Sequence, residues 1–97
     1  MPRAIILHAS DNVATLIDTG KASETVEVNG KRQLKVALKG EVPFGHKCAV
    51  TDIAKGTDIL KYGQVIGRAT RAIAAGEHVH VHNVEALRAR GDIGGKN

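Results

Sequence analysis

Apolar and polar residues alternate with a period of two along most of this chain, which is the spacing of β-strands. The alternation is clearest in residues 24–28 and 31–38, on either side of Asn29-Gly30. Asn-Gly between two alternating runs is a strong hairpin signal, because both residues accept the positive φ of a type I′ turn. The pattern therefore predicts an antiparallel hairpin closed by a two-residue turn at Asn29-Gly30.

Further short strands are predicted in the second half of the chain, with glycines between them. Their expected positions are residues 46–51, 58–60, 64–70 and 78–82. Residues 40–46, 51–57 and 70–77 each carry an apolar residue, small or polar residues and then Gly, which predicts a tight turn before a strand. At most two helical turns are expected, in residues 83–90. Many short strands with this spacing predict an all-β fold, a compact barrel or sandwich with little helix.

Composition limits the fold to one small domain. A chain of 97 residues supports a single core, and we expect the domain to span residues 1–90 and a flexible tail to span residues 91–97. Hydrophobic residues make up 42% of the chain but aromatics only 2%. The core must therefore consist mostly of Val, Ile, Leu and Ala.

Cysteine usage and charge exclude several classes of protein. Cys48 is the single cysteine, so an internal disulfide and a Cys-rich zinc site are excluded and a reducing compartment is expected. The first eight residues hold one charge and a four-residue apolar run, too short for a signal peptide or a membrane span. We therefore expect a cytoplasmic chain without a membrane partner. The net charge of +4 is spread along the chain and aromatics are few, so nucleic-acid binding is not expected.

Several motifs resemble one known family. They lie in residues 53–56, 61–70 and 73–83, with further matches in residues 11–14 and 42–47. Together they resemble the amino-terminal module of the altronate dehydratase family, over nearly all of the chain from Asp11 to about Val84 and most weakly in residues 20–39. That module is an SAF domain with a β-clip fold, so the resemblance implies the same fold here.

The resemblance implies a role in a lyase. The leading expectation is the small subunit of a sugar-acid dehydratase of the altronate or galactarate type, a carbon-oxygen lyase that is inactive without a separate large catalytic subunit. The family also implies an acidic small-molecule substrate and a divalent metal, iron or manganese, held mainly by the large subunit. One alternative is the alpha subunit of a (2R)-sulfolactate sulfo-lyase, and another is a non-catalytic SAF binding or chaperone module. An isolated copy is also expected to self-associate through its partner-facing surface.

The histidines are the first candidates for chemistry. His78, His80 and His82 alternate with two valines, so on a strand the imidazoles would share one face, about 7 Å apart in succession, while the valines face the core. His78 and His80 are candidate metal ligands, although an exposed polar face is an equally ordinary interpretation. On the resemblance, His46, His80 and His82 are candidate catalytic residues.

Three further residues are candidates for binding the substrate. Lys47 follows His46 after a turn that contains Pro43, and the resemblance makes this pair an anion site. Tyr62 offers a phenol beside a glycine, although a half-buried core aromatic would explain it equally well. Arg68 is a candidate carboxylate clamp or a solvated strand residue. Cys48 is expected to point inward and stay inert, and His8 is expected at the end of a strand; neither is assigned a role in catalysis.

Overall fold

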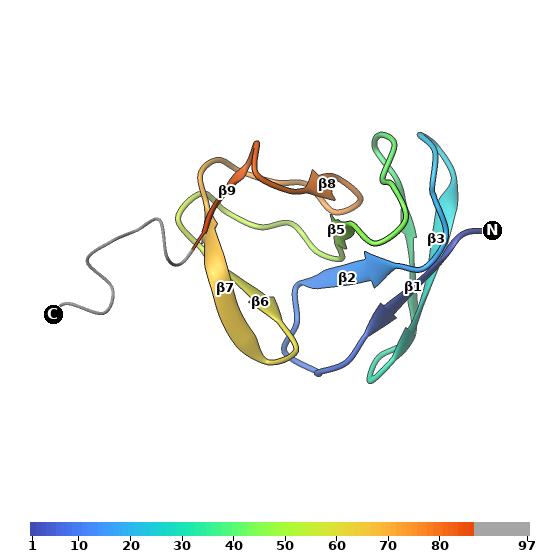
Figure 1. Cartoon of the computed structure of the whole chain (residues 1–97), viewed down its shortest axis with the longest axis horizontal. Helices are drawn as coiled ribbons and strands as arrows, with labels where there is room; N and C mark the ends of the chain where they lie inside the picture. Colours follow the sequence, from blue (N-terminus) through green and yellow to red (C-terminus); the bar gives the residue numbers. More distant parts are fainter. Residues whose placement is uncertain (87–97) are drawn as a thin grey trace, which may run out of the picture.

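The described part of the protein, residues 1–86 of a computed structural model, consists of strands joined by turns and contains no helix (Figure 1). The strands are β1 (Arg3–Ile6), β2 (Val13–Leu16), β3 (Thr25–Gly30), β4 (Leu34–Ala37), β5 (Lys47–Ala49), β6 (Asp58–Lys61), β7 (Gln64–Ala69), β8 (His78–Val79) and β9 (Val84–Ala86). The predicted all-β fold of short strands is therefore confirmed. The predicted tail in residues 91–97 lies outside the described residues.

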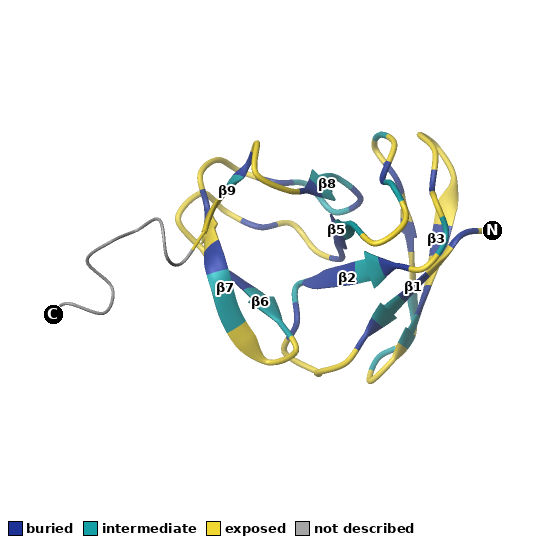
Figure 2. Ribbon diagram, in the orientation of Figure 1, coloured by how far each residue is buried: buried dark blue, intermediate teal, exposed yellow. Residues whose placement is uncertain are grey.

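Six strands form the larger sheet, in the order β4-β3-β1-β2-β5-β8. All neighbours are antiparallel except β1 and β3, which are parallel. The neighbouring strands β2 and β5 are among the most buried segments (Figure 2). One face of the sheet covers the first core. The buried residues of this core are Ala4, Ile6, Ala14, Leu16, Val26, Val28, Val36, Leu38, Val42, Cys48 and Val50.

A second core joins the larger sheet to a three-stranded sheet of order β6-β7-β9. Val13, Ala49 and Val79 enter this core from the larger sheet, and Ile59 and Ala69 enter it from the smaller one. Each large aliphatic side chain buried in this way contributes about 1.5–3 kcal/mol to the free energy of folding. Packing of the second core therefore fixes β8 and β9 relative to β7, which positions the site described below.

The predicted hairpin is present, but its turn is different from the one expected. Strands β3 and β4 are antiparallel, and Val28 pairs with Leu34, so five residues connect the paired positions and not two. Gly30 has a φ of +118° whereas Asn29 does not have a positive φ, which excludes a type I′ turn there. The reason is tertiary: Asn29 and Gly30 continue β3 alongside β1, where Gly30 pairs with Ile6.

A two-residue hairpin of the expected geometry occurs instead between β6 and β7. Lys61 pairs with Gln64, and the two residues between them, Tyr62 and Gly63, have φ values of +57° and +76°. Positive φ at both central positions is the geometry of a type I′ turn. Asp11 is 2% exposed, and its carboxylate accepts hydrogen bonds from the backbone N–H of Tyr62 at 2.8 Å and of Gly63 at 2.7 Å. The buried carboxylate therefore stabilises a turn about fifty residues away in sequence.

The glycine-containing phrases do form turns before strands, as predicted. Gly45, Gly56 and Gly76 have φ values of +84°, +87° and +92° and precede β5, β6 and β8 respectively. The helical turns predicted in residues 83–90 are wrong where the chain is described, because Val84–Ala86 is a strand that pairs with β7. Within residues 1–86, no helix is long and apolar enough to cross a membrane.

Candidate functional site

His46 joins three histidines from a distant part of the sequence, His78, His80 and His82, at one end of β5 and β8. The ring centroids of His46 and His80 are 4.5 Å apart, those of His46 and His78 are 5.0 Å apart, and those of His78 and His80 are 5.4 Å apart. The ring of His82 lies 5.4 Å from that of His78. The structure therefore brings together all four of these histidines, which the sequence analysis had selected for separate reasons.

Backbone pairing places His46 beside the other three. His46 follows the turn at Gly45, its N–H donates to Pro43 O at 3.0 Å, and its carbonyl accepts from the N–H of Leu16 at 2.9 Å. Strand β5 then pairs with β8, so that Cys48 lies opposite His78. An antiparallel pair of this kind brings side chains on the same face within reach of each other. The histidine cluster thus follows from the register of one short strand pair.

The alternation predicted for residues 78–82 is only partly correct. Strand β8 ends at Val79, which is fully buried, and the chain then turns, so Val81 is 82% exposed and does not face the core. Asn83 causes this early end. Its side-chain oxygen accepts from the N–H of His80 at 3.0 Å, its amide donates to His78 O at 2.9 Å, and its own N–H donates to His80 O at 3.1 Å.

Sequence reasoning missed the roles of Asn83 and Asp11, which are the two buried polar residues among those described. Both satisfy backbone groups of turns, as short Asn and Asp side chains commonly do. The role of Asn83 could have been predicted from its position three residues after His80, because an Asn or Asp side chain bonds to the backbone of nearby residues in many turns. For Asp11 no local signal existed, since its partners are in a different hairpin.

The cluster favours neutral imidazoles. Partial burial, followed by the neighbouring histidines and Lys47, lowers the pKa of His78 from 6.5 to about 4. The pKa of His80 is lowered as well, by desolvation first and then by His46, Lys47 and His82. Protonating one ring would place a positive charge against the others and against Lys47. At neutral pH His78 and His80 therefore present lone pairs that can accept a proton or bind a metal.

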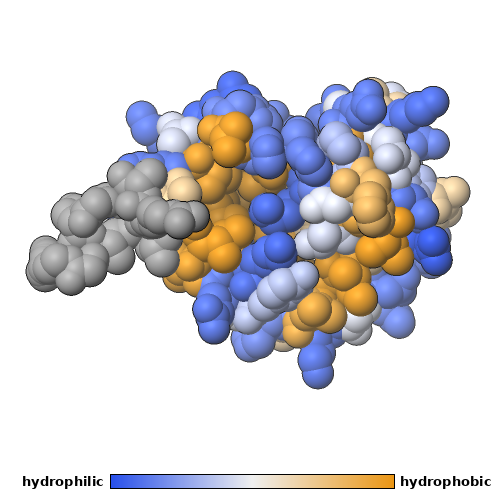
Figure 3. Space-filling model, viewed as in Figure 1, coloured by the Kyte–Doolittle hydropathy of each residue, from blue (hydrophilic) through white to orange (hydrophobic). Residues whose placement is uncertain are grey.

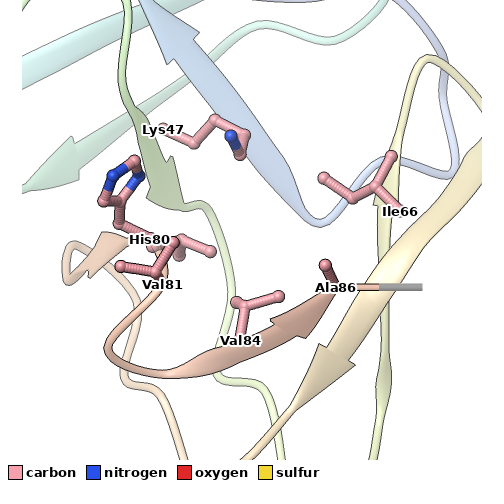
Figure 4. Close-up of a pocket in the computed structure, with 7 residues that line it drawn as sticks. Lys47, Ile66, His80, Val81, Val84 and Ala86 are labelled. Atoms are coloured by element: carbon pink, nitrogen blue, oxygen red, sulfur yellow. The ribbon is translucent and has the colours of Figure 1, made fainter. Parts of the chain in front are cut away.

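An open pocket of about 210 Å³ adjoins the cluster. Figure 4 shows Lys47 and His80 at one end of the pocket and Ile66 and Ala86 at the other. The lining residues are Lys47, Ile66, Val79, His80, Val81, Val84 and Ala86. Burial, and secondarily the nearby Lys61, lowers the pKa of Lys47. A cation and an imidazole at the rim of this pocket suit a small anion.

Tyr62 and Arg68 lie apart from the lining of this pocket. Tyr62 is half-exposed in the β6–β7 turn, with Lys61 Nζ 4.8 Å from its ring centroid. Arg68 is exposed on β7, opposite Asp58 on β6 and Glu85 on β9. Their assignment to substrate binding stays a prediction.

Two residues that the sequence analysis set aside are placed as follows. Cys48 is fully buried, as predicted, and burial raises the pKa of its thiol to about 11, which keeps it protonated and unreactive. His8 is exposed in the turn after β1, where its Nδ1 accepts from the N–H of Ser10 at 3.1 Å. A Cβ on Gly63 would lie 2.7 Å from its ring, so His8 packs against the β6–β7 turn.

Fold and site together define an all-β domain that presents clustered histidines beside a small open pocket. The chain belongs to the altronate/galactarate dehydratase SAF domain family, which matches residues 2–87. The family predicted from the motifs is therefore confirmed.

Comparison with curated relatives gives two kinds of similarity. The chain is 49% identical over 79 residues to an altronate dehydratase of Escherichia coli K12, covering 81% of this chain and 15% of that protein. It is 33% identical over 88 residues to the (2R)-sulfolactate sulfo-lyase subunit alpha of Chromohalobacter salexigens, covering 86% of this chain and 94% of that subunit. A sulfo-lyase subunit alpha from Paracoccus pantotrophus is 30% identical over 63 residues, covering 65% of this chain and 94% of that subunit. The chain thus spans a small part of the dehydratase but nearly all of either sulfo-lyase subunit.

Proposed function

We propose that this chain is the small subunit of a lyase that acts on a hydroxy-carboxylate substrate, and that it forms the substrate site together with a separate large catalytic subunit. Dehydration of a sugar acid of the altronate or galactarate type is the leading reaction. The observation that carries the proposal is the histidine cluster beside Lys47 at an open pocket, in a chain that is 49% identical to part of an altronate dehydratase.

The chemistry required by such a reaction matches these side chains. Elimination breaks a C–H bond next to the carboxylate and a C–O bond one carbon further, so a base must take the proton and the leaving hydroxide must receive one to become water. The imidazoles of His46, His80 and His82 are suited to both transfers, because a neutral ring accepts a proton and a protonated ring donates one. The ammonium group of Lys47 is suited to holding the substrate carboxylate and stabilising the enediolate that develops from it.

The pocket also suggests why a partner is needed. It is open, and the described residues contribute to it one cation, one imidazole and an apolar wall. Apolar surface extends over the β7–β9 side of the molecule (Figure 3). Excluding water from a reacting enediolate requires a closed site, and a large subunit covering this side would close it. A cytoplasmic location belongs to the same proposal, because a single buried thiol fits a reducing compartment.

A second candidate is the alpha subunit of a (2R)-sulfolactate sulfo-lyase. It is favoured by the 94% coverage of two such subunits. The same base and the same carboxylate-binding group would serve, with a C–S bond broken and sulfite released in place of water. Only the leaving group distinguishes this candidate from the first.

The test is affinity capture of the chain from an extract of its source cells, followed by assays of the recovered complex with altronate, galactarate and sulfolactate. We expect a copurifying large subunit and turnover of one of these substrates, and no turnover by the purified chain alone. A captured complex of the His80→Ala variant serves as the control for activity from contaminating enzymes. Full activity of the partner-free chain, or a complex that turns over none of the three acids, would overturn the proposal.

A further inference from the structure

The histidine cluster has the composition and geometry of a metal site. His46, His78 and His80 each offer one imidazole nitrogen, and these three nitrogens all lie within 4.8 Å of one another. One pair is closer still: Nδ1 of His46 and Nε2 of His78 are 2.9 Å apart. Two neighbouring nitrogens bound to the same ion at about 2.0–2.1 Å lie about 2.8–3.4 Å apart in octahedral or tetrahedral geometry. The spacing of the cluster is therefore close to that of a ligand set.

The backbone holds two of these rings in place and leaves the third able to adjust. His46 is fixed through its N–H and its carbonyl, and the backbone of His78 is fixed by β8 and by Asn83. His80 is exposed, so rotation of its side chain can close the longest nitrogen separation. Asn83 limits that movement because it binds the N–H of His80. Two fixed imidazoles, with a third whose side chain can rotate, suit an ion that must be taken up from solution.

We propose that His46, His78 and His80 bind a divalent transition metal on this chain itself, in a site that keeps positions open for the substrate. The proposal deepens the function proposed above, because it assigns a cofactor to the same pocket. It also differs from the expectation drawn from the family, which placed the metal mainly on the large subunit. Imidazole ligands favour zinc, cobalt, nickel, copper and ferrous iron over magnesium or calcium.

Three protein ligands are characteristic of catalytic metal sites, whereas structural zinc sites are closed by four. A bound metal would supply Lewis acidity toward the substrate carboxylate or hydroxyl. His82 lies next to the set, 5.4 Å from the ring of His78, and is not among the three ligands. With a metal bound, His46 and His80 serve as ligands in place of the proton-transfer role given above, and His82 is the imidazole that stays free to exchange protons with the substrate.

Lys47 opposes metal binding, and this gives the proposal a second test. Its ammonium group acts on His78 and His80 as a nearby positive charge. The same charge repels a cation, although it is half-buried at the pocket rim where solvent screens it in part. Lys47→Met keeps most of the apolar stem and removes the charge. We expect this variant to bind the metal more tightly than the wild-type chain does.

The experiment is isothermal titration calorimetry of Zn²⁺ and Co²⁺ into the chain, prepared without a histidine tag and stripped with chelator. We expect one ion per chain, visible d–d absorption for Co²⁺, and a loss of affinity of at least about tenfold in each of His46→Ala, His78→Ala and His80→Ala. The matched controls are His82→Ala, beside the set, and His8→Ala, on a turn away from it, and both should bind as wild type does. Circular dichroism checks that each variant is folded. If a variant at the half-buried His46 or His78 does not fold, the exposed His80→Ala decides the result.

Two outcomes would overturn the proposal: the absence of stoichiometric binding, or an equal loss of affinity in His82→Ala and His8→Ala, which would indicate non-specific binding. The result is separable from the proposed function. Stoichiometric binding by a chain that recovers no active complex leaves the site standing and rejects the lyase subunit. An active complex whose small subunit binds no metal leaves the lyase subunit standing and rejects the metal site.

Discussion

His46 and His78 are separated by 32 residues, yet Nδ1 of His46 lies 2.9 Å from Nε2 of His78. At this distance one ring donates its N–H to the lone pair of the other, so the contact requires at least one neutral imidazole. The pairing of β5 with β8 creates the contact. Loss of that pairing would therefore disperse the site even if each histidine were retained.

Titration of His78 is the first prediction. Its pKa is lowered from 6.5 to about 4, so between these values the unfolded chain binds more protons at this residue than the folded chain does. The free energy of unfolding of the metal-free protein should therefore fall as the pH is lowered from 6.5 toward 4. NMR of the imidazole protons should give a midpoint for His78 near 4. A midpoint near 6.5 would show that the ring is neither desolvated nor close to the other histidines and Lys47 as described.

The pH dependence of stability has its own control. In His78→Asn the depressed titration is absent, so unfolding in urea at pH 7 and pH 5 should show a smaller difference than in wild type. An equal difference in both proteins would assign the acid sensitivity to other groups.

Asp11 should matter for stability and not for chemistry. Asp11→Asn replaces one acceptor oxygen by an amide that cannot accept from the N–H groups of Tyr62 and Gly63. Leaving one buried N–H unpaired costs about 1–3 kcal/mol, and chemical denaturation should show a loss of that size. Glu41→Gln removes the same charge at an exposed position and should change stability by less than about 0.5 kcal/mol. Equal effects would mean that charge alone is responsible.

Two glycines offer a matched pair. A Cβ on Gly30 would lie 2.0 Å from the carbonyl oxygen of Ile6, at a φ of +118°. Gly30→Ala should therefore destabilise the fold by more than about 1 kcal/mol, because the parallel β1–β3 pair must separate. Nothing lies within 4 Å of a Cβ on Gly40, so Gly40→Ala should be neutral or slightly stabilising. Thermal melts of both variants decide the matter, and a neutral Gly30→Ala would contradict the observed register.

Reactivity of Cys48 is the fourth prediction. The thiol is fully buried and burial raises its pKa to about 11, so iodoacetamide at pH 8 should modify the native chain slowly and the urea-unfolded chain rapidly. Mass spectrometry measures both rates. Rapid modification of the native protein would show that β5 opens readily, which would also expose the histidine cluster.

The role of Asn83 can be separated from that of the histidines. Asn83→Ala removes the acceptor for His80 N–H and the donor to His78 O, both in a fully buried position. We expect a loss of stability of about 1–3 kcal/mol and weaker metal binding, because the turn no longer orients His80. Asn83→Asp restores the acceptor alone and should recover part of the affinity. Unchanged affinity in a folded Asn83→Ala would show that the turn does not position the site.

The sequence by itself determined the elements that depend on local pattern. Period-two alternation predicted most strands, glycine positions predicted the turns at Gly45, Gly56 and Gly76, and the motifs predicted the family. These features were accessible because strand pattern, positive φ and short motifs are properties of neighbouring residues.

Tertiary structure decided where those elements pair. Asn29-Gly30 has the local chemistry of a type I′ turn, but pairing with β1 extends the strand through it, and the type I′ turn occurs at Tyr62-Gly63, where buried Asp11 binds the backbone. Strand β8 ends at Val79 because Asn83 bonds to His78 and His80, and the four imidazoles meet because β5 and β8 pair. The pairing of β3 with β1, the bond of Asp11 to the β6–β7 turn and the pairing of β5 with β8 join residues distant in sequence, which no local pattern contains; only the turn at Asn83 is a local contact.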